Sequence, residues 1–275
     1  MSNTKDIQRR IKSIGNTKKI TRAMEMVAAA KMRKAVEAAL ATRSYANLSW
    51  ETLLRLTATS AEHPLFETRK EVKRQAIIVI TSNRGLCGGF NSALLNLVRA
   101  QADQNTELIL VGRKGETMAA NFSVAAEFEH PETALDAQTV LPIVRFVSEG
   151  FLSKRYDKIF IAYTDFINVA KQVPRLRQIL PIVIEASEKK SEYLFEPDAG
   201  IVLAAVVPRL LEIQLYQAFL ESIASEHSAR MAAMHQATEA ASDLAIELTL
   251  FYNKARQAAI TSEIAEITAG VAAQE

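Results

Sequence analysis

Residues 231–259 have the sequence MAAMHQATEAASDLAIELTLFYNKARQAA, in which small or apolar side chains recur every three or four positions. The recurring positions are Met231, Met234, Thr238, Ala241, Ala245, Leu248, Tyr252, Ala255 and Ala259. About four heptads of this pattern predict a helix that forms a left-handed coiled coil with a partner helix. Many of the recurring residues are small, so the axes of the two helices are expected to lie close together.

The positions of the helix-breaking residues extend this prediction to both ends of the chain. All seven prolines and seven of the nine glycines lie between Pro64 and Pro208. A proline in a helix interior costs about 3 kcal/mol and a glycine about 1 kcal/mol relative to alanine. We therefore expect two long helical arms, residues 1–63 and 208–275, with a central domain at residues 64–207 between them.

The N-terminal arm carries its own apolar pattern. Three isoleucines at positions 7, 11 and 14 are spaced by four and three, and the spacing is expected to slip after Gly15 and to resume at Ile20, Met24 and Val27. The C-terminal arm of the same chain is the expected partner, antiparallel because the central domain returns the chain. A homodimeric coiled coil is the alternative that the pattern leaves open.

The apolar stripe of the C-terminal arm changes character beyond Ala259. Four branched residues follow at helical spacing, namely Ile260, Ile264, Ile267 and Val271. If this arm extends past the N-terminal arm, this apolar tip has no partner within the chain, and an exposed apolar surface implies a socket in another protein. Fraying of an ordinary terminus is the alternative.

The net charge of +2 conceals an uneven distribution of charge along the chain. Residues 1–34 contain ten Lys or Arg against Asp6 and Glu25, a net of +8, whereas residues 209–275 contain four against nine acidic residues, a net of −5. Arms of opposite charge attract each other, and the basic arm is also suited to an acidic partner surface. Solvated helix faces of unequal charge are the simpler interpretation.

The central segment alternates strand-like and helix-like stretches. Residues 75–82 (QAIIVITS) form an apolar run typical of a strand that is covered on both faces. Further strands are expected at 107–112, 122–128, 158–163, 173–184 and 193–195, and helices at 90–104, from near Lys114 and at 135–152. This alternation predicts a Rossmann-like α/β domain. The predicted fold class is thus α/β with long terminal helices that pair as an antiparallel two-helix coiled coil.

A glycine-rich turn, residues 83–89 (NRGLCGG), follows the first predicted strand. Such a turn is where dinucleotides and phosphates bind, but the spacing is neither GxGxxG nor that of a P-loop. A tight turn with close strand–helix packing is the preferred interpretation.

No histidine is near Cys87 in the sequence, and the four histidines have no metal-ligand spacing. We therefore expect no cofactor, no metal and no catalytic residue.

Two further sequence features bear on location. The chain contains no run of eighteen apolar residues and no recognisable signal peptide, so neither a membrane span nor secretion is expected. The single cysteine excludes an internal disulfide bond and is consistent with a reducing compartment.

Three blocks of sequence resemble one protein family. They are residues 16–33 (NTKKITRAMEMVAAAKMR), 84–91 (RGLCGGFN) and 248–261 (LTLFYNKARQAAIT). In content and order they are similar to the signatures of the gamma subunit of F-type ATP synthases, of the bacterial type, and the resemblance covers the chain from Lys5 to Gly270.

The resemblance implies a rotor that is not itself catalytic. In the family, the terminal helices form a coiled coil inside a ring of three alpha and three beta subunits, and the α/β body sits on the epsilon subunit and the membrane ring of c subunits. Ion flow turns the shaft, which forces the beta catalytic sites through different affinities. The implied location is the cytoplasmic face of the bacterial inner membrane, without direct membrane insertion.

The resemblance also assigns roles to individual residues. Met24 is expected to face an acidic beta segment, flanked by basic residues, and Arg256 with Gln257 to contact an upper beta loop. Arg230, Thr261 and Glu266 match positions that tune coupling between rotation and catalysis. The flanking basic residues are Arg22, Lys31, Arg33 and Lys34, and the bearing tip consists of Ile260, Ile264, Ile267 and Val271.

The chain departs from the family pattern at Asn83, where an aspartate is usual, and it lacks the two-cysteine regulatory loop of the chloroplast version.

Two other classes of protein remain as alternatives. A nucleic-acid-binding coiled coil would use the basic arm, although residues 1–34 contain no aromatic residue for stacking on bases. An enzyme built on the α/β body would bind NAD or ATP.

Overall fold

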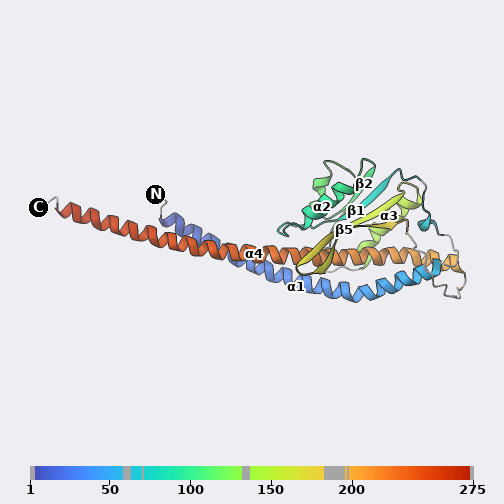
Figure 1. Ribbon diagram of the computed structural model, residues 1–275, viewed down its shortest axis with the longest axis horizontal. Coiled ribbons are helices and arrows are strands. Elements are labelled where there is room, and N and C mark those ends of the chain that lie inside the picture. The colour runs from blue at the N-terminus through green and yellow to red at the C-terminus, as the bar shows by residue number, and fades with distance from the viewer. Residues whose placement is uncertain are drawn as a thin grey trace. The chain divides into compact units, whose positions relative to one another are not determined.

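The computed structural model describes residues 4–57, 63–69, 71–131, 137–182, 196 and 198–272 (Figure 1). The chain divides into two compact units, which we name by their content. The coiled-coil unit comprises residues 1–27 and 231–275, and the body unit comprises residues 28–230. Both long helices, α1 (Thr4–Thr57) and α4 (Ala199–Ala272), contribute to both units.

Helix α4 differs from the predicted C-terminal arm in where it begins. It starts at Ala199 rather than at residue 208, and Pro208 lies inside it. Proline removes one helical hydrogen bond at a cost of about 3 kcal/mol. Three buried side chains flank the proline, namely Val207, Leu210 and Leu211. Burial of each contributes about 1.5–3 kcal/mol, so packing outweighs the helix-breaking effect. The predicted division into three domains stays a prediction.

The coiled-coil unit pairs α1 and α4 of the same chain in antiparallel orientation (Figure 1). Lys18 Nζ donates to Ser242 Oγ at 2.9 Å, and Thr238 Oγ1 donates to Thr21 Oγ1 at 2.8 Å. His235 Nδ1 lies 3.2 Å from Glu25 Oε1. Rising residue numbers on α1 therefore meet falling numbers on α4, which confirms the predicted pairing within one chain.

The predicted seam of α4 is confirmed as far as Ala255. Met234 and Ala241 are buried, and the other seam positions up to Ala255 are half-buried, whereas Ala259 is exposed. Half-buried seam positions are Met231, Thr238, Ala245, Leu248, Tyr252 and Ala255.

The predicted slip in the N-terminal pattern is wrong. Ile20 and Val27 are 61% and 56% exposed, and the inward position is Thr21, which is only 8% exposed. One glycine costs a helix about 1 kcal/mol, too little to interrupt α1 at Gly15, so the seven-residue repeat continues from Ile7. The pattern of hydrophobicity favoured Ile20 because it could not reveal that a hydroxyl partner, Thr238, faces Thr21.

The body unit contains a five-stranded sheet in the order β3-β2-β1-β4-β5. Strands β1 to β4 run parallel, and β5 pairs antiparallel with β4. The strands are β1 (Gln75–Ile80), β2 (Thr106–Val111), β3 (Ser123–Phe128), β4 (Lys158–Asn168) and β5 (Lys171–Leu180). The parallel order 3-2-1-4 is that of a doubly wound sheet, so the Rossmann-like prediction is confirmed.

Helices cover both faces of this sheet, which explains the continuous apolar run of β1. Helix α2 (Phe90–Gln101) packs on the face that includes Ile77 and Val79. Helices α3 (Leu141–Leu152) and α4 pack on the face that includes Ile78 and Ile80. Successive residues of one strand point to opposite faces, so a doubly covered strand needs an apolar residue at every position.

The predicted elements of the body are found with shifted ends. The helix expected near Lys114 is a 3-10 helix, η2 (Arg113–Met118), and shorter 3-10 helices occur at η1 (Pro64–Phe66) and η3 (Ala137–Val140). The strand expected at 193–195 lies outside the described residues. Strand β4 is longer than predicted because it continues into the hairpin with β5.

Among the residues that the structure describes, one helix is apolar enough, by length and composition, to cross a membrane. Within Gly200–Gly270 of α4, one window of 18 residues has a mean hydropathy of 1.4 and at most two charged residues, and 33% of it is buried inside the protein. A core helix of a soluble protein passes the same test, and α4 places Leu203 and Leu215 in the body core. This is weak evidence for a membrane span, and the expectation of no membrane insertion stays a prediction.

Candidate functional site

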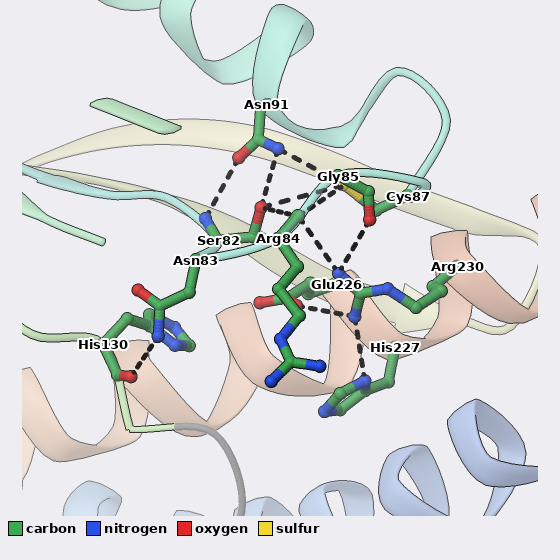
Figure 2. Close-up of polar contacts among 10 residues, drawn as sticks. All are labelled: Ser82, Asn83, Arg84, Gly85, Cys87, Asn91, His130, Glu226, His227 and Arg230. Carbon is green, nitrogen blue, oxygen red and sulfur yellow. Dashed lines mark hydrogen bonds and ion pairs between the residues drawn. The ribbon is translucent and has the colours of Figure 1, made fainter. Parts of the chain in front are cut away.

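A turn fixed by several hydrogen bonds follows β1 and leads into α2 (Figure 2). The backbone N–H of Ser82 donates to Asn91 Oδ1 at 3.0 Å, and Asn91 Nδ2 donates to Ser82 Oγ at 2.8 Å. Asn91 Nδ2 also lies 3.3 Å from Cys87 Sγ, and Ser82 Oγ donates to the carbonyl of Arg84 at 2.7 Å. Asn91, the second residue of α2, thus closes the turn onto the end of β1.

The close approach of β1 and β2 at this end of the sheet depends on Gly112. Its φ is +86°, and a Cβ there would lie 2.2 Å from the carbonyl oxygen of Thr81. Thr81 Oγ1 in turn donates to the carbonyls of Val111 and Gly112 at 2.9 Å. The base of the turn is therefore fixed by backbone contacts that leave no room for a side chain.

Arg230 of α4 reaches the tip of the turn (Figure 2). Its Nη2 donates to the carbonyl oxygens of Arg84 and Gly85, each at 3.3 Å, and its Nη1 donates to Glu226 Oε1 at 2.6 Å. The same Nη1 lies 3.2 Å from His227 Nδ1. Glu226, His227 and Arg230 are all at most 9% exposed. We call Glu226, Arg230 and the two accepting carbonyls the Arg230 clasp.

This geometry does not suit a phosphate. A phosphate-binding turn directs backbone N–H groups at the ligand, whereas this turn directs two carbonyl oxygens at a guanidinium. A cavity of about 700 Å³ at the carboxyl end of the parallel strands is lined by three glutamates, Glu116, Glu127 and Glu129, beside one arginine, Arg113. An acidic cavity repels the pyrophosphate of a dinucleotide.

The turn also gives no support to a thiol nucleophile or a metal centre. Cys87 is 2% exposed, and its polar neighbours are Ser82, Arg84 and Asn91 rather than a base. Among the described residues, no group of three or more His, Cys, Asp or Glu side chains could hold a metal ion.

Asn83 has a contact that accounts for its departure from the family pattern. Its Nδ2 donates to the carbonyl oxygen of His130 at 2.8 Å (Figure 2). A carboxylate cannot donate this hydrogen bond, so an aspartate would lose it. The amide therefore ties the turn to the segment that follows β3.

A band of buried polar side chains next to the clasp anchors α4 to β4 and to the β4–β5 turn. Ser225 Oγ donates to the carbonyl of Thr164 in β4 at 3.0 Å, and Ser228 Oγ donates to that of Val169 at 2.8 Å. Gln172 of β5 donates to Ser228 Oγ at 3.2 Å. The sequence signal for this band is the run 221–230 (ESIASEHSAR), in which polar residues interrupt an otherwise apolar helix.

A second polar cluster lines a cavity of about 580 Å³ bounded by α1, β4, β5 and α4. Burial raises the pKa of Glu221, the Asp165 carboxylate raises it further, and hydrogen bonds from Gln217 and Arg43 oppose the shift. Burial, together with the Glu221 and Asp165 carboxylates, raises the pKa of Tyr163 to about 12. Both shifts follow from desolvation of the charged form.

The predicted site residues lie on the two long helices and do not gather at one point. On α1, Met24 and Lys31 are half-buried and Arg33 and Lys34 are exposed. Arg22 is exposed and pairs with Glu25 at 2.8 Å.

The residues predicted on the last turns of α4 are all exposed. Every position from 256 to 270 is exposed, which includes Arg256, Gln257, Thr261 and Glu266. Ile260, Ile264 and Ile267 are 47%, 57% and 66% exposed, and the side chain of Val271 lies outside the described residues. The apolar tip thus has no partner among the described residues of this chain.

Arg230 is the only predicted site residue that the described structure buries, and it alone joins the turn after β1. Residues that sequence reasoning missed are its partner Glu226 and the turn residues Ser82 and Asn91. Two local signals could have indicated Glu226, namely its position four residues before Arg230, where side chains pair on a helix, and the polar interruption at 221–230.

Comparisons with known proteins agree with this architecture. A family model described as ATP synthase matches residues 3–274. An ATP synthase gamma chain from Coxiella burnetii is 42% identical over 289 aligned positions, which cover 100% of each chain. One from Dehalococcoides mccartyi is 44% identical over 287 positions, covering 99% of each.

Solved structures give the same fold at lower identity. A chain of the Euglena gracilis mitochondrial ATP synthase (OSCP/F1/c-ring, rotational state 3) has a TM-score of 0.72 at 17% identity, covering 98% of this chain and 94% of that chain. A chain from the central stalk and c-ring of the Tetrahymena thermophila enzyme has a TM-score of 0.63 at 23% identity, covering 79% and 99%. The family predicted from the three sequence blocks is confirmed: the chain belongs to the ATP synthase gamma chains.

Proposed function

We propose that this chain is the central shaft of an F-type ATP synthase, which couples ion flow through a membrane ring to ATP synthesis or hydrolysis at the beta subunits by rotation. The observation that carries the proposal, beyond family membership, is the exposed apolar end of α4. Three isoleucines, Ile260, Ile264 and Ile267, each expose about half or more of their surface on one helix without a partner in the described chain. Such a surface calls for a surrounding apolar sleeve.

An apolar sleeve suits rotation because apolar contacts have no preferred direction. Hydrogen bonds and ion pairs depend on geometry, so a tip held by them would have preferred angles. Dispersion and hydrophobic contacts are individually small and non-directional. The isoleucine tip, with Val271 at its end, would therefore turn with little resistance.

The basic residues of α1 would supply a different kind of contact. Arg33 and Lys34 are exposed, and Arg22 is exposed while paired with Glu25. Together with Lys31 and with Met24 they would face an acidic segment of beta. Exposed ion pairs contribute about 0.2–1 kcal/mol each, so torque would be spread over many weak contacts, including those of Arg256, Gln257, Thr261 and Glu266.

We further propose that the chain contributes no catalytic group and binds no cofactor. The turn after β1 supports this, because its carbonyls face Arg230 and the neighbouring cavity is lined by glutamates. The chemistry would take place on the beta subunits.

The proposed partners are three alpha and three beta subunits, an epsilon subunit and the membrane c-ring. The proposed location is the cytoplasmic face of a bacterial inner membrane. The similar gamma chains of Coxiella burnetii and Dehalococcoides mccartyi, both bacterial, support this location.

Reconstitution with a rotation probe tests the proposal. The chain would be co-expressed with alpha and beta subunits, purified by size and assayed for magnesium-dependent ATP hydrolysis. The probe belongs on Asn96→Cys, an exposed position of α2, because Cys87 is 2% exposed and is part of the turn.

The expected result is a complex of one gamma, three alpha and three beta subunits in which the probe rotates stepwise during hydrolysis. A chain that stays outside the complex, or that is motionless while ATP is hydrolysed, would overturn the proposal.

A further inference from the structure

The turn after β1 includes a residue, Leu86, in a backbone conformation that is unfavourable for its side chain. Leu86 has a φ of +62°, a strained region that bulky residues rarely adopt. Its side chain is 62% exposed, so burial of Leu86 does not provide the stabilisation. The surrounding contacts must therefore fix the turn.

Two sets of contacts do so, one from each side. Asn91 and Ser82 fix the turn from within the body's own β1–α2 connection. The Arg230 clasp fixes it from α4, through the only charged donor among the contacts described for the turn's backbone carbonyls. Of these two sets, the clasp is the one that joins the turn to α4, and its donor is charged.

Glu226 holds the Arg230 guanidinium in position to donate to the carbonyls of Arg84 and Gly85. The Glu226–Arg230 pair joins adjacent turns of α4 at 2.6 Å, and both side chains are about one-tenth exposed. A buried arginine without its carboxylate is an uncompensated charge, and the remaining Nη2 contacts are long, at 3.3 Å. Loss of Glu226 should therefore loosen the guanidinium from the turn.

The clasp lies at the point along α4 where the body unit ends. Arg230 is the last residue of the body unit, and α4 enters the coiled-coil unit at Met231. Upstream of it, Ser225 and Ser228 tie the same helix to carbonyls of β4 and of the β4–β5 turn through single neutral hydrogen bonds.

We propose that the Arg230 clasp is a torsional lock, which prevents α4 from twisting against the sheet where the helix leaves the body. Glu226 is then a positioning residue that acts through Arg230, and Asn91 and Ser82 hold the opposite side of the turn. The inference rests on the proposed function, because a lock against twist matters only in a chain that transmits torque.

The experiment uses the assembled complex and the variant Glu226→Gln. The first readout is the rate at which a maleimide labels Cys87, the only cysteine of this chain, with the label located by mass spectrometry. Cys87 is buried in the turn, so its reactivity reports opening of the turn independently of rotation. The second readout is ATP synthesised or ions pumped per ATP hydrolysed.

A matched control is available on the same helix. Arg209 and Glu212 also form a 2.6 Å pair, but the Arg209 side chain is 73% exposed. Glu212→Gln therefore removes a carboxylate of equal type and distance without touching the clasp.

We expect Glu226→Gln to label Cys87 at least about tenfold faster, equivalent to about 1.4 kcal/mol, and to lower the coupling ratio at least about twofold. Glu212→Gln should change neither. Arg230→Lys keeps the charge but loses the planar fork, so it should give an intermediate result, and it replaces Glu226→Gln if that variant fails to assemble.

Labelling within about twofold of the unmodified complex would overturn the clasp itself. Faster labelling with an unchanged coupling ratio would overturn the torsional role. Failure of the proposed shaft function would appear separately, as an absence of probe rotation in the unmodified complex.

Discussion

Gly150 has no room for a side chain, and its neighbours cannot yield. A Cβ there would lie 2.7 Å from Cδ2 and 2.8 Å from Cε2 of Tyr156. The Tyr156 ring is fully buried, and its hydroxyl donates to Glu107 Oε2 at 2.6 Å, so moving the ring would break that hydrogen bond. The ring is therefore fixed both by packing and by a charged acceptor.

Gly150→Ala should lower the free energy of unfolding by about 1–3 kcal/mol, the usual cost of overpacking a core. Urea unfolding of the full chain measures this. The control is Gly15→Ala, another helical glycine, where a Cβ would meet nothing within 4 Å. It should stabilise the chain by up to about 1 kcal/mol. Equal effects of the two substitutions would contradict the packing argument.

Glu221 makes stability depend on pH in an identifiable direction. Its pKa is raised above the ordinary value of 4.5, first by burial and then by the Asp165 carboxylate. Between 4.5 and the raised value, the folded state binds more protons at this residue than the unfolded state does. The contribution of Glu221 to the free energy of unfolding therefore falls as the pH rises through that interval.

Glu221→Gln removes this titration, so its stability relative to the original chain should increase as the pH rises from 4.5 and then level off. Urea midpoints of both proteins between about pH 4.5 and 7.5 measure the difference, with Glu212→Gln as the control on the same helix. A difference that stays constant across this range would show that Glu221 titrates normally.

At the scale of elements, the seam between α1 and α4 depends on small side chains. Ala241 is 8% exposed in the seam, whereas its neighbour Ala240 is exposed on the same helix. Near this level the helices approach closely enough for Thr238 Oγ1 and Thr21 Oγ1 to form a 2.8 Å hydrogen bond. A larger residue in the seam must push the helices apart.

Ala241→Leu should therefore destabilise the chain by about 1–3 kcal/mol. Ala240→Leu should change its stability by no more than about 0.5 kcal/mol, because leucine and alanine are both good helix formers at an exposed site. Circular dichroism during thermal unfolding distinguishes the two. A seam that accepts leucine at position 241 without loss would mean that the helices are not closely packed there.

The elements differ in how far the sequence could predict them. Strand β1 and the seam of α4 were predicted because their patterns are long and regular. The position of Thr21 in the seam and the passage of α4 through Pro208 were not, since both depend on a partner segment distant in the sequence. In each case contacts with the distant segment outweigh a local helix-breaking effect worth about 1–3 kcal/mol.

At the scale of the whole molecule, the predicted contact residues are distributed along two helices. Arg256 is exposed on α4, as are its neighbours Gln257 and Lys254. A single exposed cation is worth about 0.2–1 kcal/mol in an ion pair, which corresponds to no more than roughly a fivefold change in an equilibrium constant.

Arg256→Ala should thus leave assembly intact and lower ATP synthesis relative to hydrolysis by no more than about fivefold. Measurement in membrane vesicles of the complete enzyme gives both rates, and Lys254→Ala, two residues earlier on the exposed part of α4, is the control. Failure to recover the complex would contradict the view that assembly depends on many weak contacts spread along the two helices.

The candidate site shows where prediction from sequence ends. The resemblance assigned Arg230 to coupling, and its position on α4 was predictable. Its burial against Arg84 and Gly85 was not, because no local pattern links a helix residue to a turn about 145 positions earlier. Glu226 was missed although it lies four positions before Arg230, a spacing at which side chains pair on a helix, and although its polar neighbours in a buried helix were a signal.

The exposed turns of α4 from 256 to 270 have a thermodynamic consequence. These residues are exposed throughout and gain little from packing against the described part of the chain, so the helix–coil equilibrium governs them, and an isolated helix of fewer than about 12–15 residues is marginal in water. In the free chain their amide protons should exchange quickly. Enclosure in a sleeve would slow that exchange, and part of the binding free energy would be spent on ordering the helix, so the tip would bind more weakly than its apolar area suggests.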